Sequence, residues 1–223
     1  PFAADRAALE AAGIAFPNQE YSTRYADPEN SYVYEAGLKG SWPAVSFNLA
    51  VFYQYIKGFQ SNIFIGTGFV LRNAGKQSVQ GVEFEGMVRP AKPLTLSVAM
   101  TYLDGKYDKF LLSAFGDLSG TVPAGFSPLS ATFAAEWNQP IGTSNLIARI
   151  DYHYEAPFKL VEGLPNLVVK NPITDQVLSV NAALEAAREF KQEINDLNAS
   201  LTYAMENGLE LTVWGRNLLD DRT

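Results

Sequence analysis

The chain has no cysteine among its 223 residues. This absence excludes a thiol nucleophile, a disulfide framework, and an iron–sulfur cluster or zinc ion held by thiolates. Histidine is nearly as scarce, because His153 stands alone. A Ser-His-Asp triad would have to be built on that one residue, and no G-x-S-x-G motif supplies its nucleophile. We therefore expect neither catalytic activity nor a cofactor.

Long apolar runs are absent as well. No window holds the roughly 18 uninterrupted apolar residues that a membrane-spanning helix needs, although 47% of the residues are hydrophobic and 13% are aromatic. The mean hydropathy is -0.06. Such a value is typical of alternating strands in a membrane β-barrel and equally of a soluble β-rich domain, so composition leaves both open.

Basic residues are fewer than acidic ones: the chain has 17 Lys and Arg and 24 Asp and Glu, which give a net charge of -7. Without a basic face to neutralise phosphates, nucleic acid is excluded as a partner. The chain opens on "PFAADRAALE", with neither an initiator Met nor a signal peptide, and stops on "LTVWGRNLLDDRT". We expect a piece of a longer protein, in which case the missing signal is no argument for the cytoplasm.

What the sequence does have is alternation. In "AVSFNLAVFYQYI", large apolar residues at Phe47, Leu49 and Val51 alternate with small or polar ones, and Phe52 is the exception. Period two is typical of a strand with one apolar and one wet face. The recurring pattern predicts an all-β fold, an antiparallel up-and-down meander of about eight strands, each paired with its sequence neighbour. Their expected ranges are 31–41, 44–65, 69–89, 94–109, 127–138, 144–157, 189–204 and 208–218.

The connections alternate between short turns and long excursions. Two helix-forming patches, 5–13 and 181–189, fall in the long excursions. The two arms of 44–89 exceed the roughly 9–11 residues that cross a bilayer, so this hairpin should project past it. Asn73 to Gly75 look like a bulge in its returning arm. Short turns on one edge and long loops on the other are typical of outer-membrane barrels.

The faces opposite the apolar rows carry acids and bases together. These residues fit either the lining of a watery lumen or a solvated outer surface: Glu35, Lys39, Glu83, Glu85, Glu136, Arg149, Asp151, His153, Glu210 and Arg216. The apolar rows carry aromatics near strand ends, as girdles at two membrane interfaces would: Tyr32, Tyr34, Tyr53, Tyr55, Tyr102, Trp137, Tyr152, Tyr154 and Tyr203. They favour a membrane barrel, while aromatics that rim an ordinary soluble core remain the alternative.

Four motifs follow one another along the chain: "YEAGLKG" after "ADPENSY", then "NAGKQSVQGVEFEG", "LTLSVAMTYLDGKY" and "LTVWGRNLLDD". In this order and spacing they resemble the C-terminal barrel half of TonB-dependent outer-membrane receptors, from about Ala26 onward. The resemblance implies a segment of a transmembrane β-barrel of about 22 strands with a plugged lumen. Residues 1–30 would be an outer loop, 31–218 barrel strands and loops, and 219–223 the start of a further loop. The plug domain and the last strand would lie outside this chain.

The resemblance also implies a function. It points to an energy-coupled receptor in the outer membrane of a Gram-negative bacterium, importing a scarce nutrient such as a ferric siderophore, cobalamin or an oligosaccharide. The implied partners are outer-membrane lipid, the receptor's own plug domain, and the TonB energy-coupling complex through an N-terminal region. The alternative is a self-contained small β-barrel or β-sandwich that binds an apolar ligand inside, because eight strands can close a small barrel.

Three groups of residues invite a functional interpretation. "DYHYE" puts Asp151, His153 and Glu155 on one face; these types bind metals, but the roughly 6.6–7 Å between alternate strand residues favours a polar row instead. Glu83 and Glu85 either meet cations of the plug or of a substrate path, or simply hydrate the lumen. Three outer-loop aromatics either catch a ligand or pack their loop: Phe110, Phe115 and Phe126.

The pleat makes an orientation prediction. If Phe47, Leu49, Val51 and Tyr53 face lipid, then Leu94, Leu96, Val98 and Met100 share that convex side, and Glu83, Glu85, Glu136, Arg149 and Asp151 lie on the concave one. An Arg on the lipid face at mid-bilayer costs roughly 2–4 kcal/mol. Val51→Arg should therefore impair membrane assembly more than Ser97→Arg, which is expected on the lumen side.

Overall fold

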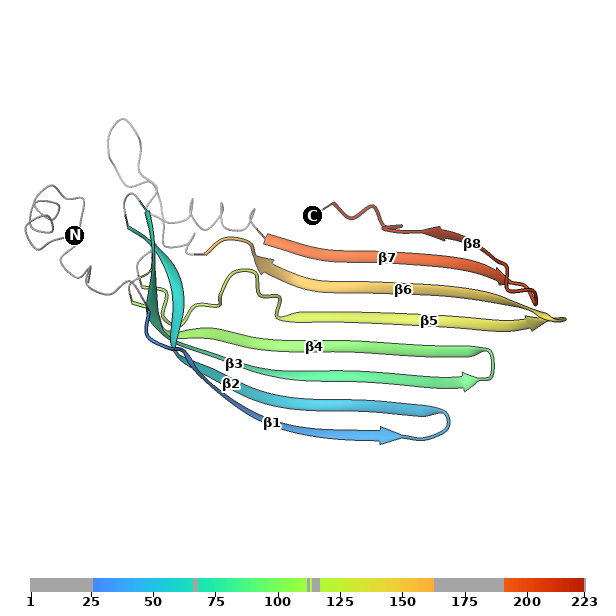
Figure 1. The fold of residues 1–223 in the computed structure, drawn as a ribbon, viewed down its shortest axis with the longest axis horizontal. Helices are drawn as coiled ribbons and strands as arrows, with labels where there is room; N and C mark the ends of the chain where they lie inside the picture. The colour runs from blue at the N-terminus through green and yellow to red at the C-terminus, as the bar shows by residue number, and fades with distance from the viewer. Residues whose placement is uncertain (1–25, 66–67, 112, 114–116, 163–190, 223) are drawn as a thin grey trace, which may run out of the picture.

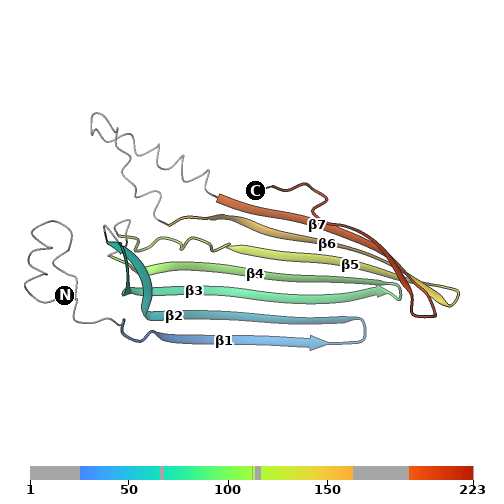
Figure 2. The ribbon, with the colours of Figure 1, turned by 45° about the horizontal axis from the view of Figure 1, so that its top comes forward.

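A computed structural model of the chain describes residues 26–65, 68–111, 113, 117–162 and 191–222. The described residues form one antiparallel sheet in the order β1-β2-β3-β4-β5-β6-β7-β8. Figures 1 and 2 show this meander as a curved wall of long strands side by side. Its elements are β1 (Asn30–Ser41), β2 (Val45–Ile65), β3 (Gly68–Ala91), β4 (Leu94–Lys109), β5 (Leu129–Ile141), β6 (Ser144–Lys159), β7 (Lys191–Ala204) and β8 (Glu210–Gly215).

The predicted all-β meander is confirmed, with every strand paired to its sequence neighbour. Two ends differ from expectation by three residues, and the others by two or fewer. β5 continues through Pro140 to Ile141, where Pro is tolerated because the strand is about to turn. β8 stops at Gly215 rather than at residue 218, because Asn217 takes a left-handed φ of 48° and ends the extended run. The two helix-forming patches lie outside the described residues.

The turns that join β1 to β2, β3 to β4, β5 to β6 and β7 to β8 lie at one end of the sheet (Figure 1). At the opposite end the connections after β4 and β6 are long, and β2 and β3 themselves extend past the neighbouring strands. Gly142 and Gly208 take left-handed φ values of 63° and 85° in two of the short turns, a conformation that glycine adopts at no steric cost. We call the end with these short turns the narrow end and the opposite end the loop-bearing end.

The β2–β3 hairpin carries a double bulge near the loop-bearing end. The pairing passes from Lys57↔Lys76 to Phe59↔Gly75, which leaves Gly58 without an opposite residue, and then to Gln60↔Asn73. The expected bulge at 73–75 is thus confirmed, with a counterpart on β2. A Cβ at Gly75 would lie 2.1 Å from the backbone oxygen of Lys109, so only glycine fits there. Beyond the bulges the hairpin bends away from the line of the other strands (Figures 1 and 2).

The bulge also changes which side of the sheet a residue faces. Below it, Tyr55 and Lys57 share one face of β2; simple alternation would place Phe59 there too. Phe59 instead packs with Tyr107 and Phe110 on the other face, and Leu118 completes this small buried core. One extra residue in each strand has inverted the alternation. The core therefore lies at the loop-bearing end of the sheet.

Candidate functional site

The register divides the sheet into two chemically different faces. One transverse row runs through Phe47, Gly86, Val98, Phe133 and Tyr152. One residue along, the adjacent row is Lys39, Asn48, Glu85, Ala99, Thr132, His153 and Asp196. Because neighbouring residues of a strand point to opposite faces, the first row belongs to an apolar face and the second to a polar face. No helix in the described part of the chain is long and apolar enough to cross a membrane.

The polar face carries a broad hollow. One open cavity on it is lined by residues of six successive strands, from Lys39 on β1 to Arg149 on β6. Cavities on the opposite face span four or five strands, and the wider span is what the inside of a curved sheet provides. Short side chains make the floor of the broad hollow, and longer polar ones stand at its sides: Lys39, Asn48, Glu85, Ser97, Ala99, Thr132, Ala134 and Arg149. We call the polar side the concave face.

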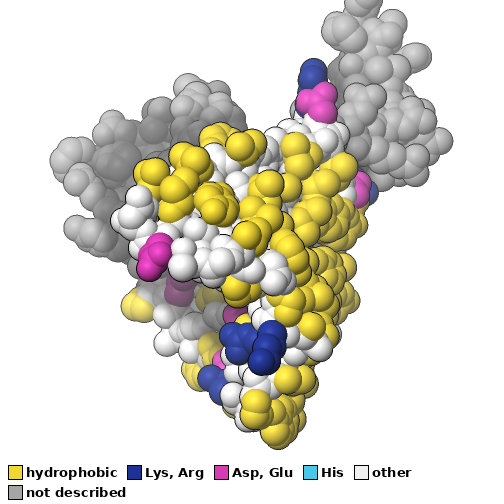
Figure 3. Space-filling model, turned by 90° about the vertical axis from the view of Figure 1, so that its right-hand side faces the viewer, with side chains coloured by type: hydrophobic (Ala, Val, Ile, Leu, Met, Phe, Trp, Pro, Cys, Tyr) yellow, Lys and Arg dark blue, Asp and Glu magenta, His cyan; other side chains and the backbone are white. Residues whose placement is uncertain are grey.

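The opposite, convex face is apolar and open to its surroundings. Leu38 is 59% exposed, Phe133 51% and Val213 78%, values that would leave a very large apolar patch on a soluble monomer. Seen along the strands, hydrophobic side chains cover a whole flank of the molecule (Figure 3). The convex row predicted from the pleat, Leu94, Leu96, Val98 and Met100, is in register with Phe47, Leu49 and Val51 through β3.

Aromatic side chains bound the convex apolar band at both ends. Tyr32 and Tyr55 stack with ring centroids 4.8 Å apart near the loop-bearing end, and Tyr53 lies beside them. Trp42 and Phe47 stack at 6.0 Å near the narrow end. Further aromatics lie on the same convex face: Tyr34, Tyr102, Trp137, Tyr152, Tyr154 and Tyr203.

A chain of polar contacts crosses the concave face of β5, β6 and β7. Arg149 lies 3.7 Å from Glu136 and 3.5 Å from Asp151, measured between guanidinium nitrogen and carboxylate oxygen. The Arg149 and Glu136 side chains are about half exposed, so these ion pairs add little stability in water. The Asn198 side chain then donates to both Asp151 at 3.1 Å and Asp196 at 3.0 Å. Three predicted concave residues of these strands therefore belong to one connected network.

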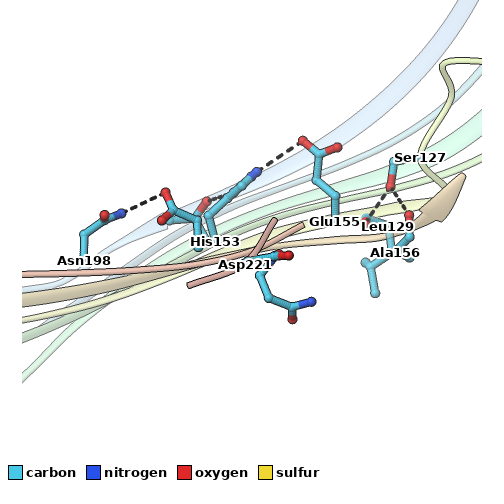
Figure 4. A network of polar contacts seen from close by, with 10 residues as sticks. Ser127, Leu129, His153, Glu155, Ala156, Asn198 and Asp221 are labelled. Atoms are coloured by element: carbon cyan, nitrogen blue, oxygen red, sulfur yellow. Dashed lines mark hydrogen bonds and ion pairs between the residues drawn. The ribbon is translucent and has the colours of Figure 1, made fainter. Parts of the chain in front are cut away.

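His153 forms a second set of polar contacts on the same face, nearer the loop-bearing end. Its Nδ1 lies 2.9 Å from the Thr132 hydroxyl and its Nε2 lies 3.2 Å from Glu155. Figure 4 shows Asn198, His153 and Glu155 on the same side of the strands. Asp151 turns to Arg149 and Asn198 rather than to the imidazole. Among the described residues no group of three or more acids and histidines is arranged to hold a metal ion.

The remaining polar candidates on paired strands also lie on the concave side of the register. Glu35 is opposite Phe52, and Glu83 is opposite Ala50. Glu85 accepts a hydrogen bond from Asn48 at 3.1 Å. At the short edge strand, Arg216 stands 5.1 Å from the centre of the Trp214 ring. Glu210 begins β8 at the narrow end.

Phe52 and Phe126 show how aromatics are accommodated on this polar face. Each lies against a glycine, since a Cβ at Gly81 would be 2.5 Å from the Phe52 ring and a Cβ at Gly105 2.6 Å from the Phe126 ring. Glycine on the neighbouring strand makes the space that the ring fills. Phe52, which breaks the alternation in the sequence, therefore lies on the concave face in the space that Gly81 leaves open.

Two of the three outer-loop aromatics, Phe110 and Phe126, lie within the described residues. Phe110 is 4% exposed and meets Tyr107 at 5.1 Å and Phe59 at 5.3 Å between ring centroids. It packs the loop instead of presenting a ring to the outside. Phe126 is half-buried over Gly105. Phe115 lies outside the described residues.

The connection after β4 is fastened to the end of β6 by backbone contacts, with Gly125 N–H donating to the Lys159 carbonyl at 2.7 Å, and by one carboxylate. Glu162 accepts hydrogen bonds from the Tyr107 hydroxyl at 2.8 Å and from the Ala124 backbone N–H at 2.6 Å. Within the same connection, hydrogen bonds from the Ser119 hydroxyl and backbone N–H lower the pKa of the Asp117 carboxyl. The loop-bearing end of the concave face is thus built by contacts between residues distant in sequence.

A clamp that sequence reasoning missed holds the segment before β1. The Asn73 amide accepts from Asp27 N–H at 2.7 Å, and donates to the carbonyls of Asp27 at 2.8 Å and Gly58 at 2.6 Å. Gln60 joins it through its side chain to Asp27 and through its backbone N–H to Glu29. The motifs "ADPENSY" and "NAGK" that the sequence singled out are therefore contact partners. The signal in the sequence for this contact was that the two motifs occur together in one chain.

A family model described as "TonB dependent receptor-like, beta-barrel" matches residues 5–218. The chain belongs to the TonB-dependent receptor β-barrel family. Its all-β meander is a part of that barrel, and the convex apolar and concave polar faces are two sides of a TonB-dependent receptor wall. The predicted resemblance is confirmed.

Solved structures share the fold at low sequence identity. The chain is 19% identical to the ferric yersiniabactin uptake receptor FyuA from Yersinia pestis (TM-score 0.62, covering 86% of this chain and 25% of that one). It is 16% identical to BauA, the ferric preacinetobactin receptor from Acinetobacter baumannii (TM-score 0.59, 86% and 25%). The copper transporter OprC is 17% identical (TM-score 0.55, 87% and 26%). The chain thus spans about a quarter of the length of these proteins.

Proposed function

We propose that this chain is a wall segment of an energy-coupled receptor that imports a scarce nutrient through the outer membrane of a Gram-negative bacterium. The observation that carries the proposal is the orientation of the sheet. A wide apolar band, bounded by aromatic belts at both ends, lies on the convex side, where the charged residues Lys57, Lys76, Lys106 and Asp104 lie at the loop-bearing end. The acids and bases between the belts lie on the concave side. A barrel in lipid needs this arrangement, whereas a soluble barrel needs the reverse.

The concave face supports a role as lumen wall. Its shallow floor of Ala99, Ala134, Ser97 and Thr132 leaves room above the sheet, and the ladder of acids and bases beside it offers partners to a polar surface. We assign that surface to the receptor's plug domain, with ionised groups of the wall facing those of the plug. The TonB complex would act on the plug and not on this segment.

The open edges of the sheet support a larger barrel. β1 pairs only with β2 and β8 only with β7 among the described strands. An edge in lipid leaves backbone groups without hydrogen-bond partners, which costs several kcal/mol for each group. We therefore place further strands of the same receptor at both edges.

The nutrient is proposed at the level of class. FyuA is named as an uptake receptor for ferric yersiniabactin, BauA as the ferric preacinetobactin receptor and OprC as a copper transporter. These names support an iron- or copper-related cargo beside cobalamin and oligosaccharides. The fold alone does not choose among them, because such barrels place specificity in loops.

The test is uptake by cells that carry or lack the receptor. Labelled ferric siderophores, a copper chelate, cobalamin and oligosaccharides are offered separately, with and without a protonophore. We expect one class to enter only when the receptor is present and the membrane is energised. Uptake that the protonophore leaves unchanged would indicate a passive pore and overturn the proposal.

The alternative binding module is tested with residues 26–223 expressed alone. A soluble monomer that binds an apolar dye stoichiometrically would favour it. The convex exposure of Leu38 and Val213 argues against that outcome, because a dry interior needs those residues inside.

A further inference from the structure

Two lysines stand over the tyrosines of the convex face at its loop-bearing end. Lys57 and Lys76 are directly opposite each other on β2 and β3. The Lys57 ammonium lies 5.4 Å from the Tyr32 ring centre and 5.7 Å from that of Tyr55, and the Lys76 ammonium lies 5.0 Å from that of Tyr55. Lys106 on β4 is exposed on the same face, opposite Ser78.

This group has more positive charge than its neighbours balance. Lys76 meets Asp108 at 3.6 Å, and Asp108 also accepts from Ser78 at 2.9 Å. Within the described part of the chain, Lys57 and Lys106 have no carboxylate within ion-pair distance. Like charges directly opposite on paired strands repel. The tyrosine faces attract both ammonium groups weakly, and an anion between them would remove the repulsion.

The height of the lysines matches a membrane interface. Ten residues separate Phe47, in the belt at the narrow end, from Lys57. At about 3.4 Å per residue and a tilt of about 40° that is about 26 Å of depth. The apolar band of an outer-membrane barrel is about 25 Å tall. Lys57 and Lys76 therefore lie where the hydrocarbon ends and headgroups begin, on the side of the long loops.

We propose that Lys57, Lys76 and Lys106, on a base formed by Tyr32 and Tyr55, bind a phosphate-bearing lipid headgroup of the outer leaflet. The inference rests on the proposed orientation of the chain in the outer membrane. Lysine stems lie along apolar surface while their ammonium groups reach the polar layer. The phosphate accepts hydrogen bonds from the ammonium groups, and the tyrosine rings pack against the adjoining part of the lipid at the interface.

The experiment uses the complete receptor purified in a neutral detergent. Its thermal unfolding midpoint is followed while three probes are titrated: diphosphorylated lipid A, the same lipid after removal of its phosphates, and inorganic phosphate. The variant Lys57→Gln/Lys76→Gln/Lys106→Gln is compared with Lys39→Gln, which removes one lysine from the concave face. A triple Lys→Arg variant keeps the charge and shows whether folding, rather than charge, is at issue.

We expect the phosphorylated lipid to stabilise the wild type, Lys39→Gln and the Arg variant at similar concentrations. The triple Gln variant should need on the order of 100-fold more, since each interfacial lysine contributes about fivefold. Equal titration of the wild type and the triple Gln variant would overturn the proposal. So would stabilisation by inorganic phosphate at the concentration of the lipid, because the patch would then be a general anion site.

Failure here is distinguishable from failure of the proposed function. Recovery of the wild-type receptor from the outer-membrane fraction tests the orientation on which both depend. A receptor that is found there, yet does not discriminate between the lipid with and without phosphate, contradicts the headgroup site alone.

Discussion

Val51 lies near the middle of the convex apolar band, and replacing it with Arg is the sharpest test of the two faces. It pairs with Ala36 on one side and Val82 on the other, neither of which could receive the new charge. Four residues separate it from Phe47 and six from Lys57. At about 3.4 Å per residue and a tilt of about 40°, Val51 is about 10 Å from one boundary and 16 Å from the other.

A guanidinium at that depth should destabilise the folded barrel by roughly 2–4 kcal/mol. One factor of ten corresponds to about 1.4 kcal/mol, so the folded-to-unfolded ratio falls roughly 30- to 700-fold. The assay refolds the complete receptor into lipid vesicles across a urea series and follows the folded band by its heat-dependent electrophoretic mobility. Val51→Arg should shift the midpoint to lower urea in proportion.

Two controls bracket this result. Ser97 lies opposite Met87 and Ala134 on the concave face, and Ser97→Arg should have a smaller effect. Ala50 is a closer match in depth, since it adjoins Val51 and lies opposite Glu83, whose carboxylate would pair with an introduced Arg. If Ala50→Arg and Ser97→Arg proved more damaging than Val51→Arg, the two faces would be inverted and the apolar row would be a dry interior.

Three further predictions concern the loop-bearing end. Asn73→Ala removes three hydrogen bonds that hold Asp27 and the bulge, so it should cost about 2 kcal/mol and speed hydrogen exchange in the segment before β1; unchanged exchange would contradict the clamp. In Gly75→Ala the added methyl group meets the backbone of β4, so this change should lower the free energy of unfolding by about 2 kcal/mol or more. Gly120→Ala is the control: its methyl group meets open space at φ 80°, and it should lower the free energy of unfolding by only about 1 kcal/mol. Glu162→Ala should expose the connection after β4 to limited proteolysis, while Glu162→Gln, which keeps an acceptor oxygen, should protect it better; equal cleavage of both variants and the wild type would show that the carboxylate does not fasten the loop.

The strands were predictable because their signal is local. Period-two alternation and turn residues suffice to place β4, whose observed range Leu94–Lys109 is the expected one. Once the strands are in sequence order, the pleat assigns Val51 and Ser97 to opposite faces without further information. The family motifs reached the same barrel independently.

What escaped prediction depends on contacts across the sequence. The exception at Phe52 is understandable only when Gly81 lies beside it on the next strand. The position of Phe59 depends on an extra residue at Gly58, which in the sequence is one glycine among many. The bonds of Glu162 to Tyr107 and Ala124 join residues 55 and 38 positions apart. No local pattern encodes such pairs.

The double bulge lets the projecting hairpin change length without turning its side chains over. Gly58 and Ala74 are the unpaired residues on the two arms. Because each bulge absorbs one residue, deletion of both would restore a regular ladder and leave Phe59 on the side of the loop core. The part of the hairpin outside the membrane would still present the same side chains to extracellular ligands, phages and antibodies. A receptor lineage could therefore gain or lose this pair of residues while its outermost epitope stays the same.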